Sequence, residues 1–274
     1  GSYTTALYFY NDDIRNRILE KQEIENDMQR GIDHEEFMVY IQPKYSLKTL
    51  SIKSGEALVR WKHPKKDIIP PDMFIPLFEE NGFIVQLDMY MLKKVCKQLR
   101  TWIDSGKTPV SISVNQSRLH LHNPNYLRTI IQILETYQIS PKWIELEITE
   151  SAFFEDTEKM IEILNSLHEA GFKISMDDFG SGYSSLNMLQ EITVDVLKID
   201  KNFFKDSSNS DRGKKIVDNI ITMASDLDIV VVAEGVETKE QVEFLKKTDC
   251  DLVQGYFFSK PLPMDEFEKK LFNE

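Results

Sequence analysis

The sequence predicts an α/β barrel of the TIM type, on the strength of three observations. From residue 37 onward, short β-rich runs alternate with longer segments of helical period, the pattern of parallel strands joined by crossover helices. The runs number about eight, as such a barrel requires. Polar residues end most of the runs. These ends favour the barrel over an open doubly wound sheet with the same alternation.

The expected strands contain four to eight residues with β-branched or aromatic side chains, apart from a less regular last run near residues 252–258. They cover residues 37–42, 53–60, 110–115, 143–148, 173–177, 194–200, 229–234 and 252–258. The segments between them place apolar residues three and four apart, which indicates helices. The clearest of these cover residues 86–103, 124–137, 157–170, 212–227 and 239–246.

The strand ends carry the groups expected to form a site. In a TIM barrel, catalytic groups stand at the carboxyl ends of the strands and meet at one mouth. The residues at these ends are Gln42, Glu56, Asn115, Glu147, Asp177, Lys198 and Glu234. Any one of them could be a solvated loop residue, but the whole series indicates a functional site.

Residues 1–33 differ from the rest and are expected to precede the barrel, which takes residues 34–274. Gly1-Ser2 is interpreted as a cloning remnant and residues 3–10 as the end of an upstream domain. Residues 13–30 predict a charged connector helix that begins after the capping segment 11–13. The alternative is an ordinary N-terminal helix packed on the barrel.

Composition narrows the function classes. The formal net charge of -12 argues against binding long nucleic acid, which needs a basic surface. An anionic substrate would therefore need metal ions. The sequence has neither a membrane-length apolar run nor a signal-peptide pattern, so we expect a cytoplasmic chain, with any membrane anchor left to upstream regions. Cys96 and Cys250 are expected to be reduced, buried thiols.

The metal-ligand candidates are all oxygen donors. They are Glu56, Asn115, Glu147, Asp177, Asp178 and Glu234. Carboxylate and amide oxygens suit Mg²⁺ or Mn²⁺, whereas zinc and copper sites draw on His and Cys. The five histidines form no metal-spaced pair on one helix. The sequence therefore favours a hard divalent cation.

Asp177 and Asp178 close a strand and open the glycine-rich segment FGSGY. Neighbouring side chains of a strand point in opposite directions, so one carboxylate could bridge two cations while the other serves one. A solvated or helix-capping turn is the alternative, with Gly180 and Gly182 needed only for their backbone freedom.

Two cationic residues are candidates beside these acids. Lys198 and Asp200 share one strand face, and a lysine surrounded by carboxylates stays protonated and can position a water or a phosphoryl oxygen. Arg60 follows Glu56 by four residues on the same face and could bind phosphate. The alternatives are a lysine that reaches the surface and an ion pair within the strand.

Longer motifs follow one another along the chain. They are IQP, GEALVRW, IIPPDMFIPLFEENG, SVNQS, ELEITES, DDFGSGYSSL, LKID, AEGVET and QGYFFSKPLP. With these motifs in this order over nearly all of residues 34–270, the sequence resembles the EAL-domain family of cyclic-di-GMP phosphodiesterases. The naming triplet Glu56-Ala57-Leu58 by itself would be unspecific.

The resemblance implies hydrolysis of cyclic di-GMP (c-di-GMP) to linear pGpG with Mg²⁺ or Mn²⁺, and inhibition by Ca²⁺. It implies one metal on Glu56, Asn115, Glu147 and Asp177 and a second on Asp177, Asp178 and Glu234. Lys198 would orient a water that attacks phosphorus in line. Substrate contacts are expected from Gln42, Arg60, Asp200, Glu237 and Gln254.

The resemblance also implies a barrel in which one strand runs against the others. Glu150 would anchor the loop of residues 178–186, which contributes to the second metal site and to a homodimer interface. An upstream GGDEF domain is the family's usual neighbour. Ile41 stands where the family usually has an aromatic residue, so weaker base stacking is expected.

Two other functions compete with this interpretation. A degenerate EAL domain would bind c-di-GMP or scaffold a partner without catalysis, but such domains usually lack metal ligands or the loop-anchoring glutamate, which are all present here. A metal-dependent barrel lyase would also use strand-end carboxylates and a lysine. The order of the motifs favours the phosphodiesterase.

Overall fold

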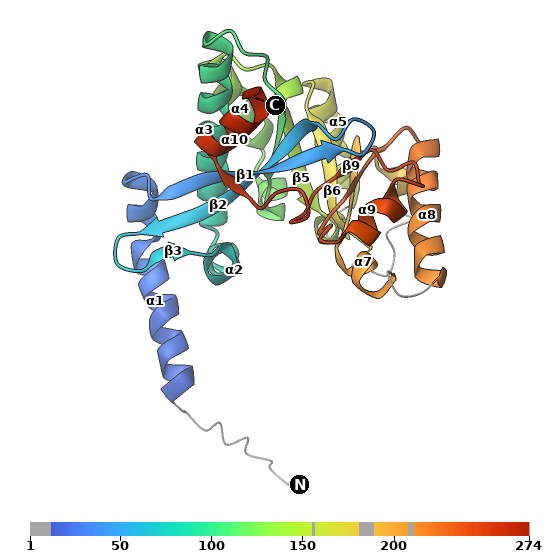
Figure 1. Ribbon diagram of the computed structural model, residues 1–274. Coiled ribbons are helices and arrows are strands. Elements are labelled where there is room, and N and C mark those ends of the chain that lie inside the picture. The colour runs from blue at the N-terminus through green and yellow to red at the C-terminus, as the bar shows by residue number, and fades with distance from the viewer. Residues whose placement is uncertain (1–11, 155–156, 181–188, 208–210, 274) are drawn as a thin grey trace, which may run out of the picture. The chain divides into compact units, whose positions relative to one another are not determined.

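A computed structural model describes residues 12–154, 157–180, 189–207 and 211–273 (Figure 1). The chain divides into two compact units. Unit 1 comprises Gly1–Met38 with Arg60–Ile84, and unit 2 comprises Val39–Val59 with Val85–Glu274. Strands β1 (Phe37–Ser46) and β2 (Ile52–His63) contribute residues to both units.

The described part of unit 2 contains a closed ring of eight strands. Following β1 and β2, these are β4 (Ser111–Asn115), β5 (Ile144–Thr149), β6 (Lys173–Phe179), β7 (Val196–Ile199), β8 (Val230–Ala233) and β9 (Leu252–Val253). Strands β2, β4, β5, β6, β7, β8 and β9 pair in parallel, and pairing of β1 with β2 closes the ring. Strand β1 runs antiparallel to β9. The predicted barrel and its single antiparallel strand are confirmed.

Helices cover the outside of the barrel strands (Figure 1). The five expected helices are α3 (Ile84–Asp104), α4 (Tyr126–Tyr137), α5 (Thr157–Glu169), α8 (Asp211–Asp226) and α9 (Lys239–Leu245). In α3, Leu92, Val95 and Leu99 are completely buried at helical spacing, as an amphipathic helix requires. Burial of one such side chain contributes roughly 1.5–3 kcal/mol.

Several shorter elements of unit 2 were not expected from the sequence. They are η1 (Arg118–His122), η2 (Pro141–Trp143), η3 (Glu150–Phe154), α7 (Asn202–Ser207), β10 (Leu262–Pro263) and α10 (Met264–Asn273). Strand β10 pairs antiparallel with β1. These elements are too short or too weakly periodic for their patterns to stand out.

Unit 1 has its own aromatic core. It contains α1 (Asp12–Asp33), α2 (Pro71–Glu80), β3 (Asp67–Ile69), and the ends of β1 and β2. The rings of Phe37, Trp61, Phe74 and Phe78 lie with centroids 4.8 to 6.0 Å apart. Such tilted and edge-on contacts are favourable for aromatic pairs.

Helix α1 changes character along its length. Ile18 and Leu19 in its first half are 42% and 48% exposed, whereas Ile24 is buried. In the second half, Asp27 Oδ2 lies 2.8 Å from His63 Nε2, and Arg30 Nε donates to Glu36 Oε1 at 3.0 Å. The predicted helix is present, and its second half packs within unit 1.

The predicted division at residue 33 remains a prediction. Residues 3–10, interpreted as an upstream strand, and the capping residue Asn11 lie outside the described residues. Among the helices that the structure does describe, none has the length and apolar character that crossing a bilayer demands. The predicted buried thiols Cys96 and Cys250 are both buried and unpaired.

Candidate metal and phosphodiester site

One cavity at the strand ends of unit 2 brings together most of the predicted site residues. Those that line it are Gln42, Glu56, Asp177, Asp178, Lys198, Asp200, Glu234, Glu237 and Gln254. Asn115 joins them because its Nδ2 donates to Glu56 Oε1 at 3.3 Å. Because parallel strands end at one rim, residues as far apart in sequence as Glu56 and Gln254, 198 positions, meet there.

Lys198 lies at the centre of the acidic groups and is 1% exposed. Its Nζ is 2.9 Å from Glu234 Oε1 and 3.0 Å from both Glu147 Oε2 and Asp177 Oδ1. Glu56 Oε2 lies 3.5 Å away. A buried ammonium is stable only with such partners. The structure therefore agrees with the interpretation of Lys198 as an inward-facing lysine.

Glu56 accepts hydrogen bonds from the amide side chains of Asn115 and Gln254. Gln254 Nε2 donates to Glu56 Oε2 at 2.5 Å and to Gln42 Oε1 at 3.2 Å. Both Gln42 and Gln254 are nearly buried, and Gln254 Oε1 has no hydrogen-bond partner among the described residues. That oxygen is a free acceptor at the cavity.

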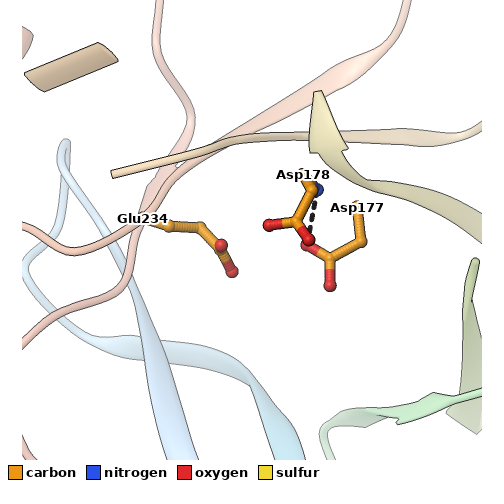
Figure 2. Close-up of side chains that lie close together, drawn as sticks. All are labelled: Asp177, Asp178 and Glu234. Carbon is orange, nitrogen blue, oxygen red and sulfur yellow. Dashed lines mark hydrogen bonds between the residues drawn. The ribbon is translucent and has the colours of Figure 1, made fainter. Parts of the chain in front are cut away.

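The Asp177-Asp178 turn differs from the expected geometry. Asp178 has φ 57° in the left-handed region, and the pairing of β6 with β7 shifts register between Met176 and Phe179. Asp177, Asp178 and Glu234 each place a carboxylate oxygen within 4.8 Å of the others (Figure 2). The prediction that the two aspartates point in opposite directions is wrong, because the bulge interrupts the alternation.

The turn is tied to the end of β5. Glu150 is almost completely buried, and its Oε2 accepts a hydrogen bond from Gly180 N at 2.8 Å. Gly180 has φ 91°, and a β-carbon there would collide with the ring of Phe203, so only glycine fits. Glu150 thus holds the chain two residues after Asp178. The rest of the predicted anchored loop, from residue 181, lies outside the described residues.

The loops after β8 and β9 are joined by backbone hydrogen bonds beside the cavity. Val236 N donates to Gln254 O at 3.1 Å, and Phe257 N donates to Val236 O at 3.0 Å. A β-carbon on Gly255 would meet the backbone of Val236, so this close approach needs a glycine. These hydrogen bonds between the two loops fix the positions of Glu234 and Gln254.

The cluster carries more negative than positive charge. Its carboxylates are Glu56, Glu145, Glu147, Asp177, Asp178 and Glu234, and its cations are Lys44 and Lys198. With every group ionised, six carboxylates against two ammonium groups would leave four negative charges in excess, to which Asp200 and Glu237 on the cavity wall would add. An anionic phosphodiester would be repelled unless cations offset this charge.

Burial and the crowding of negative charge raise the pKa values of several carboxyl groups in the cluster. Burial, with the neighbouring Glu147, raises the pKa of Glu56 to about 7. Burial also raises the pKa of Glu234 to about 8, although Lys198 opposes the shift. For Asp178, burial followed by Asp177 and Asp200 raises the pKa to about 6. Burial alone would raise the pKa of Glu147 too, but Lys198 and Lys44 lower it below its usual range.

The donor set fits hard divalent cations. Apart from its ion pair with Lys198, the buried Glu147 Oε2 has no hydrogen-bond partner among the described residues. Its remaining lone pairs are open to a further cation, which would offset more of its negative charge. The available ligands are carboxylate and amide oxygens, which Mg²⁺ and Mn²⁺ prefer.

Sequence reasoning missed the charged layer behind this cavity. Lys44 is completely buried, and its Nζ donates to Glu147 Oε1 at 2.9 Å and to Glu145 Oε1 at 3.0 Å. A signal was present: Lys44 follows Gln42 by two residues, and Glu145 precedes Glu147 by two. Period-two spacing puts each pair on one strand face.

The other predicted residues, Ile41, Asp200 and Arg60, lie in different surroundings. Ile41 is completely buried and contacts the backbone at Gly55. The expectation of weaker base stacking at Ile41 stays a prediction. Asp200 is nearly buried, and its Oδ1 accepts from Asn202 N at 2.7 Å. Arg60 belongs to unit 1, and its role stays a prediction.

The fold and the cavity define a class of protein, a TIM-type barrel with an acidic, lysine-centred cavity at its strand ends. Comparison with known proteins then identifies the family. A family model described as EAL domain matches residues 25–261. The chain belongs to the EAL domain family.

Named relatives share this similarity. The chain is 36% identical over 263 residues to the cyclic di-GMP phosphodiesterase NbdA of Pseudomonas aeruginosa, covering 96% of this chain and 34% of the relative. It is 33% identical over 258 residues to the bifunctional diguanylate cyclase/cyclic di-GMP phosphodiesterase MucR of the same organism, covering 94% of this chain and 38% of MucR. The chain thus spans little more than a third of the length of these relatives.

A solved structure agrees with the fold. The PaMucR phosphodiesterase in complex with c-di-GMP superposes with a TM-score of 0.84 at 33% identity, covering 89% of this chain and 99% of that chain. The shared barrel therefore extends over nearly the whole of that phosphodiesterase chain.

Proposed function

We propose that this chain hydrolyses c-di-GMP to linear pGpG by a two-metal, in-line mechanism. The observation that carries the proposal is the group of carboxylates gathered around the buried Lys198, most of which line one cavity. Relatives that cover most of this chain are named as cyclic di-GMP phosphodiesterases. The similar PaMucR structure holds c-di-GMP.

Two groups of residues would hold the cations. Glu56, Asn115, Glu147 and Asp177 form the first group, and Asp177, Asp178 and Glu234 form the second. Two divalent cations would supply activation of a water molecule and stabilisation of negative charge on the phosphoryl oxygens. Mg²⁺ or Mn²⁺ suits this donor set.

The chain's own residues would orient the reaction. The Lys198 ammonium, fixed by Glu147, Asp177 and Glu234, has the position to orient the attacking water or a phosphoryl oxygen. Substrate contacts are assigned to the polar residues Gln42, Arg60, Asp200, Glu237 and Gln254. Rigid placement of such groups lowers the entropic cost of reaching the reactive geometry.

The decisive experiment is incubation of the purified chain with c-di-GMP and Mg²⁺ or Mn²⁺, followed by chromatographic separation of pGpG. We expect turnover that EDTA abolishes and Ca²⁺ inhibits, because the longer, looser coordination of calcium misplaces the nucleophile. Undiminished turnover in EDTA would exclude the two-metal mechanism. A simple phosphodiester such as bis(p-nitrophenyl) phosphate serves as the specificity control.

Binding of c-di-GMP in Mg²⁺ and in Mn²⁺ without formation of pGpG would contradict catalysis. The chain would then be a c-di-GMP receptor or a protein scaffold. Faster cleavage of the simple phosphodiester than of c-di-GMP would instead point to a different substrate. The two outcomes are separable because one is measured by binding and the other by product.

We further propose a homodimer formed partly through residues 178–186, and an upstream GGDEF domain in a longer protein. The second proposal is supported by the greater length of the relatives and by the two activities in the name of MucR. We place the action of the barrel in the cytoplasm, with any membrane anchor outside this sequence. Light scattering of the active chain tests the dimer, since a fully active monomer would show that dimerisation is not required.

A further inference from the structure

Behind the cavity, Lys44 occupies a place where a TIM barrel ordinarily has an apolar side chain. Lys44 lies on β1, two residues beyond the cavity-lining Gln42, and is completely buried. Barrel interiors are usually filled by Val, Ile and Leu. A lysine at such a position costs free energy unless it is fully paired, so its presence calls for an explanation.

The ammonium of Lys44 uses all of its donors. Its Nζ lies 2.9 Å from Ser113 Oγ, 3.0 Å from Glu145 Oε1 and 2.9 Å from Glu147 Oε1. A lysine has three N–H groups, so this set is complete. The three partners come from two neighbouring strands, β4 and β5. Lys44 is therefore held in one orientation.

The two carboxylate oxygens of Glu147 contact two different lysines. Its Oε1 accepts from Lys44, while its Oε2 lies 3.0 Å from Lys198. The contact to Lys44 fixes the rotation of the carboxylate, because complete burial of the Glu147 side chain keeps solvent from replacing that donor. Oε2 is thereby turned toward the residues that line the cavity.

Stability alone does not account for Lys44. Replacing buried ion pairs by apolar residues of similar volume is often neutral or stabilising, so an apolar pair at positions 44 and 145 would hold the barrel together as well. What an apolar pair could not supply is a fixed donor to Glu147 Oε1. Outer contacts of this kind orient metal ligands and tune metal affinity.

We propose that Lys44 is a positioning residue for the metal centre, which holds Oε1 of Glu147 so that Oε2 is presented to a divalent cation. This inference rests on the proposed function, because it assigns Glu147 as a ligand. Lys44 itself does not line the cavity. Its effect should therefore appear in metal affinity before it appears in turnover.

The test measures Mn²⁺ binding to the metal-free protein by calorimetry, without substrate. Lys44→Met keeps the length of the side chain and removes its charge and donors. We expect it to weaken binding at the Glu147 site by roughly 10–100-fold, the usual effect of losing an outer contact to a ligand. Turnover at saturating Mn²⁺ should recover toward that of wild type, whereas turnover at limiting Mn²⁺ should not.

Two matched variants separate positioning from simple charge balance. Glu145→Gln removes the other acidic partner of Lys44 and should bind Mn²⁺ no more weakly than wild type. Lys44→Met/Glu145→Gln leaves no unpaired charge at positions 44 and 145 and should still bind Mn²⁺ weakly. If the double variant regained wild-type affinity, Lys44 would serve only to neutralise Glu145 and the proposal would be overturned.

The remaining outcomes are also decisive. Circular dichroism and thermal melts report whether each variant folds, and the double variant decides if Lys44→Met does not. Normal Mn²⁺ affinity in a folded Lys44→Met protein would overturn the role of Lys44 and leave the proposed function standing. Absence of Mn²⁺ binding in wild type would overturn the metal centre and the role of Lys44 with it.

Discussion

Glu147 and Asp178 contribute to one acidic cluster, yet the protein holds them in different ways. Glu147 lies inside β5, is completely buried and lies between Lys44 and Lys198. Asp178 lies at the end of β6 with its side chain only partly shielded by the cavity, has a left-handed backbone and is followed by a turn that Glu150 holds through Gly180. We call these the strand side and the turn side of the cavity.

The comparison teaches that the two proposed cation sites differ in preorganisation. On the strand side, burial would raise the pKa of Glu147, but Lys198 and Lys44 lower it below its usual range. This proposed ligand is therefore ionised before a cation binds. On the turn side, burial and neighbouring acids raise the pKa of Asp178, and its positive φ costs on the order of 1–3 kcal/mol. The turn side should therefore depend more on bound metal and on distant anchors.

The largest effect is expected where the two sides meet. Asp177→Asn removes the carboxylate assigned to both cation groups, so hydrolysis should fall by about 10³-fold or more, about 4 kcal/mol of transition-state stabilisation. Glu56→Ala and Glu234→Ala, each on one side, should also nearly abolish hydrolysis. Asp265→Asn, an exposed carboxylate on α10, is the matched control. Near wild-type turnover in Asp177→Asn would remove the shared ligand from the mechanism.

Lys198 contacts ligands of both sides and should give the next largest effect. Lys198→Ala is expected to lower kcat by about 10²–10³-fold, because a positioned donor to the reacting oxygens is lost. Affinity for c-di-GMP, measured in Ca²⁺, should change far less. Lys269→Ala, on an exposed lysine, controls for loss of one positive charge. Normal turnover with weak binding would reassign Lys198 to substrate capture.

The dependence of the turn side on an anchor is tested at Glu150. Glu150→Ala removes the acceptor of the Gly180 N–H and should weaken the metal affinity of the turn side by roughly 10–100-fold, with a parallel loss of activity at limiting metal. Glu150→Gln keeps an acceptor oxygen and should lose less. Equal, unchanged activity and metal affinity in both variants would show that the turn does not need this anchor.

The carboxylates of the cluster should also respond differently to pH, with a raised pKa for one on each side of the cavity. Without metal, Glu56 and Glu234 have pKa values of about 7 and 8, above the 4.5 of an unperturbed glutamate. Their contribution to stability is therefore present at low pH and is lost as the pH rises through 7 to 8. A bound cation replaces these protons, so Mg²⁺ affinity should rise by at least about tenfold between pH 6 and 8.5.

Calorimetry in buffers of different ionisation enthalpy would show the released protons directly. Thermal melts should show a larger stabilisation by Mg²⁺ at pH 8.5 than at pH 6. Glu147, already ionised in this range because its lysines lower its pKa, should contribute no protons. An Mg²⁺ affinity independent of pH would contradict the raised pKa values.

The smallest effect is expected outside both sides. Deleting residues 1–22 takes away the part of α1 that precedes the buried Ile24, in which Ile18 and Leu19 are exposed. It should leave hydrolysis within about twofold of wild type, since exposed side chains contribute little. Deleting residues 1–33 also removes Asp27 and Arg30, which leaves Glu36 and His63 without these partners. That longer deletion should lower the melting temperature. Equal stability of the two truncated proteins would support a connector along the whole helix.

Much of the fold was open to prediction because its signals are local. Period-two and helical spacing located all eight barrel strands and the five main helices. The expectation that one strand runs against the others came only from the resemblance, because a strand's residue pattern does not record which neighbour it will pair with. The structure identifies that strand as β1. The buried ion pair of Lys44 and Glu145 was not predicted from the sequence. Their two-residue spacing from Gln42 and Glu147 would have placed each on the same strand face as a site residue.

The sequence by itself determined which chemical groups the site contains and which strand ends carry them, because strand alternation and the order of the motifs are properties of the chain alone. Only the tertiary structure decided how those groups face one another. The bulge at Asp178 turned two neighbouring carboxylates to one side, and β1 brought Lys44 against Glu147 across 103 residues. Both depend on pairing between strands, since backbone register and the mutual burial of opposite charges arise only when distant segments meet.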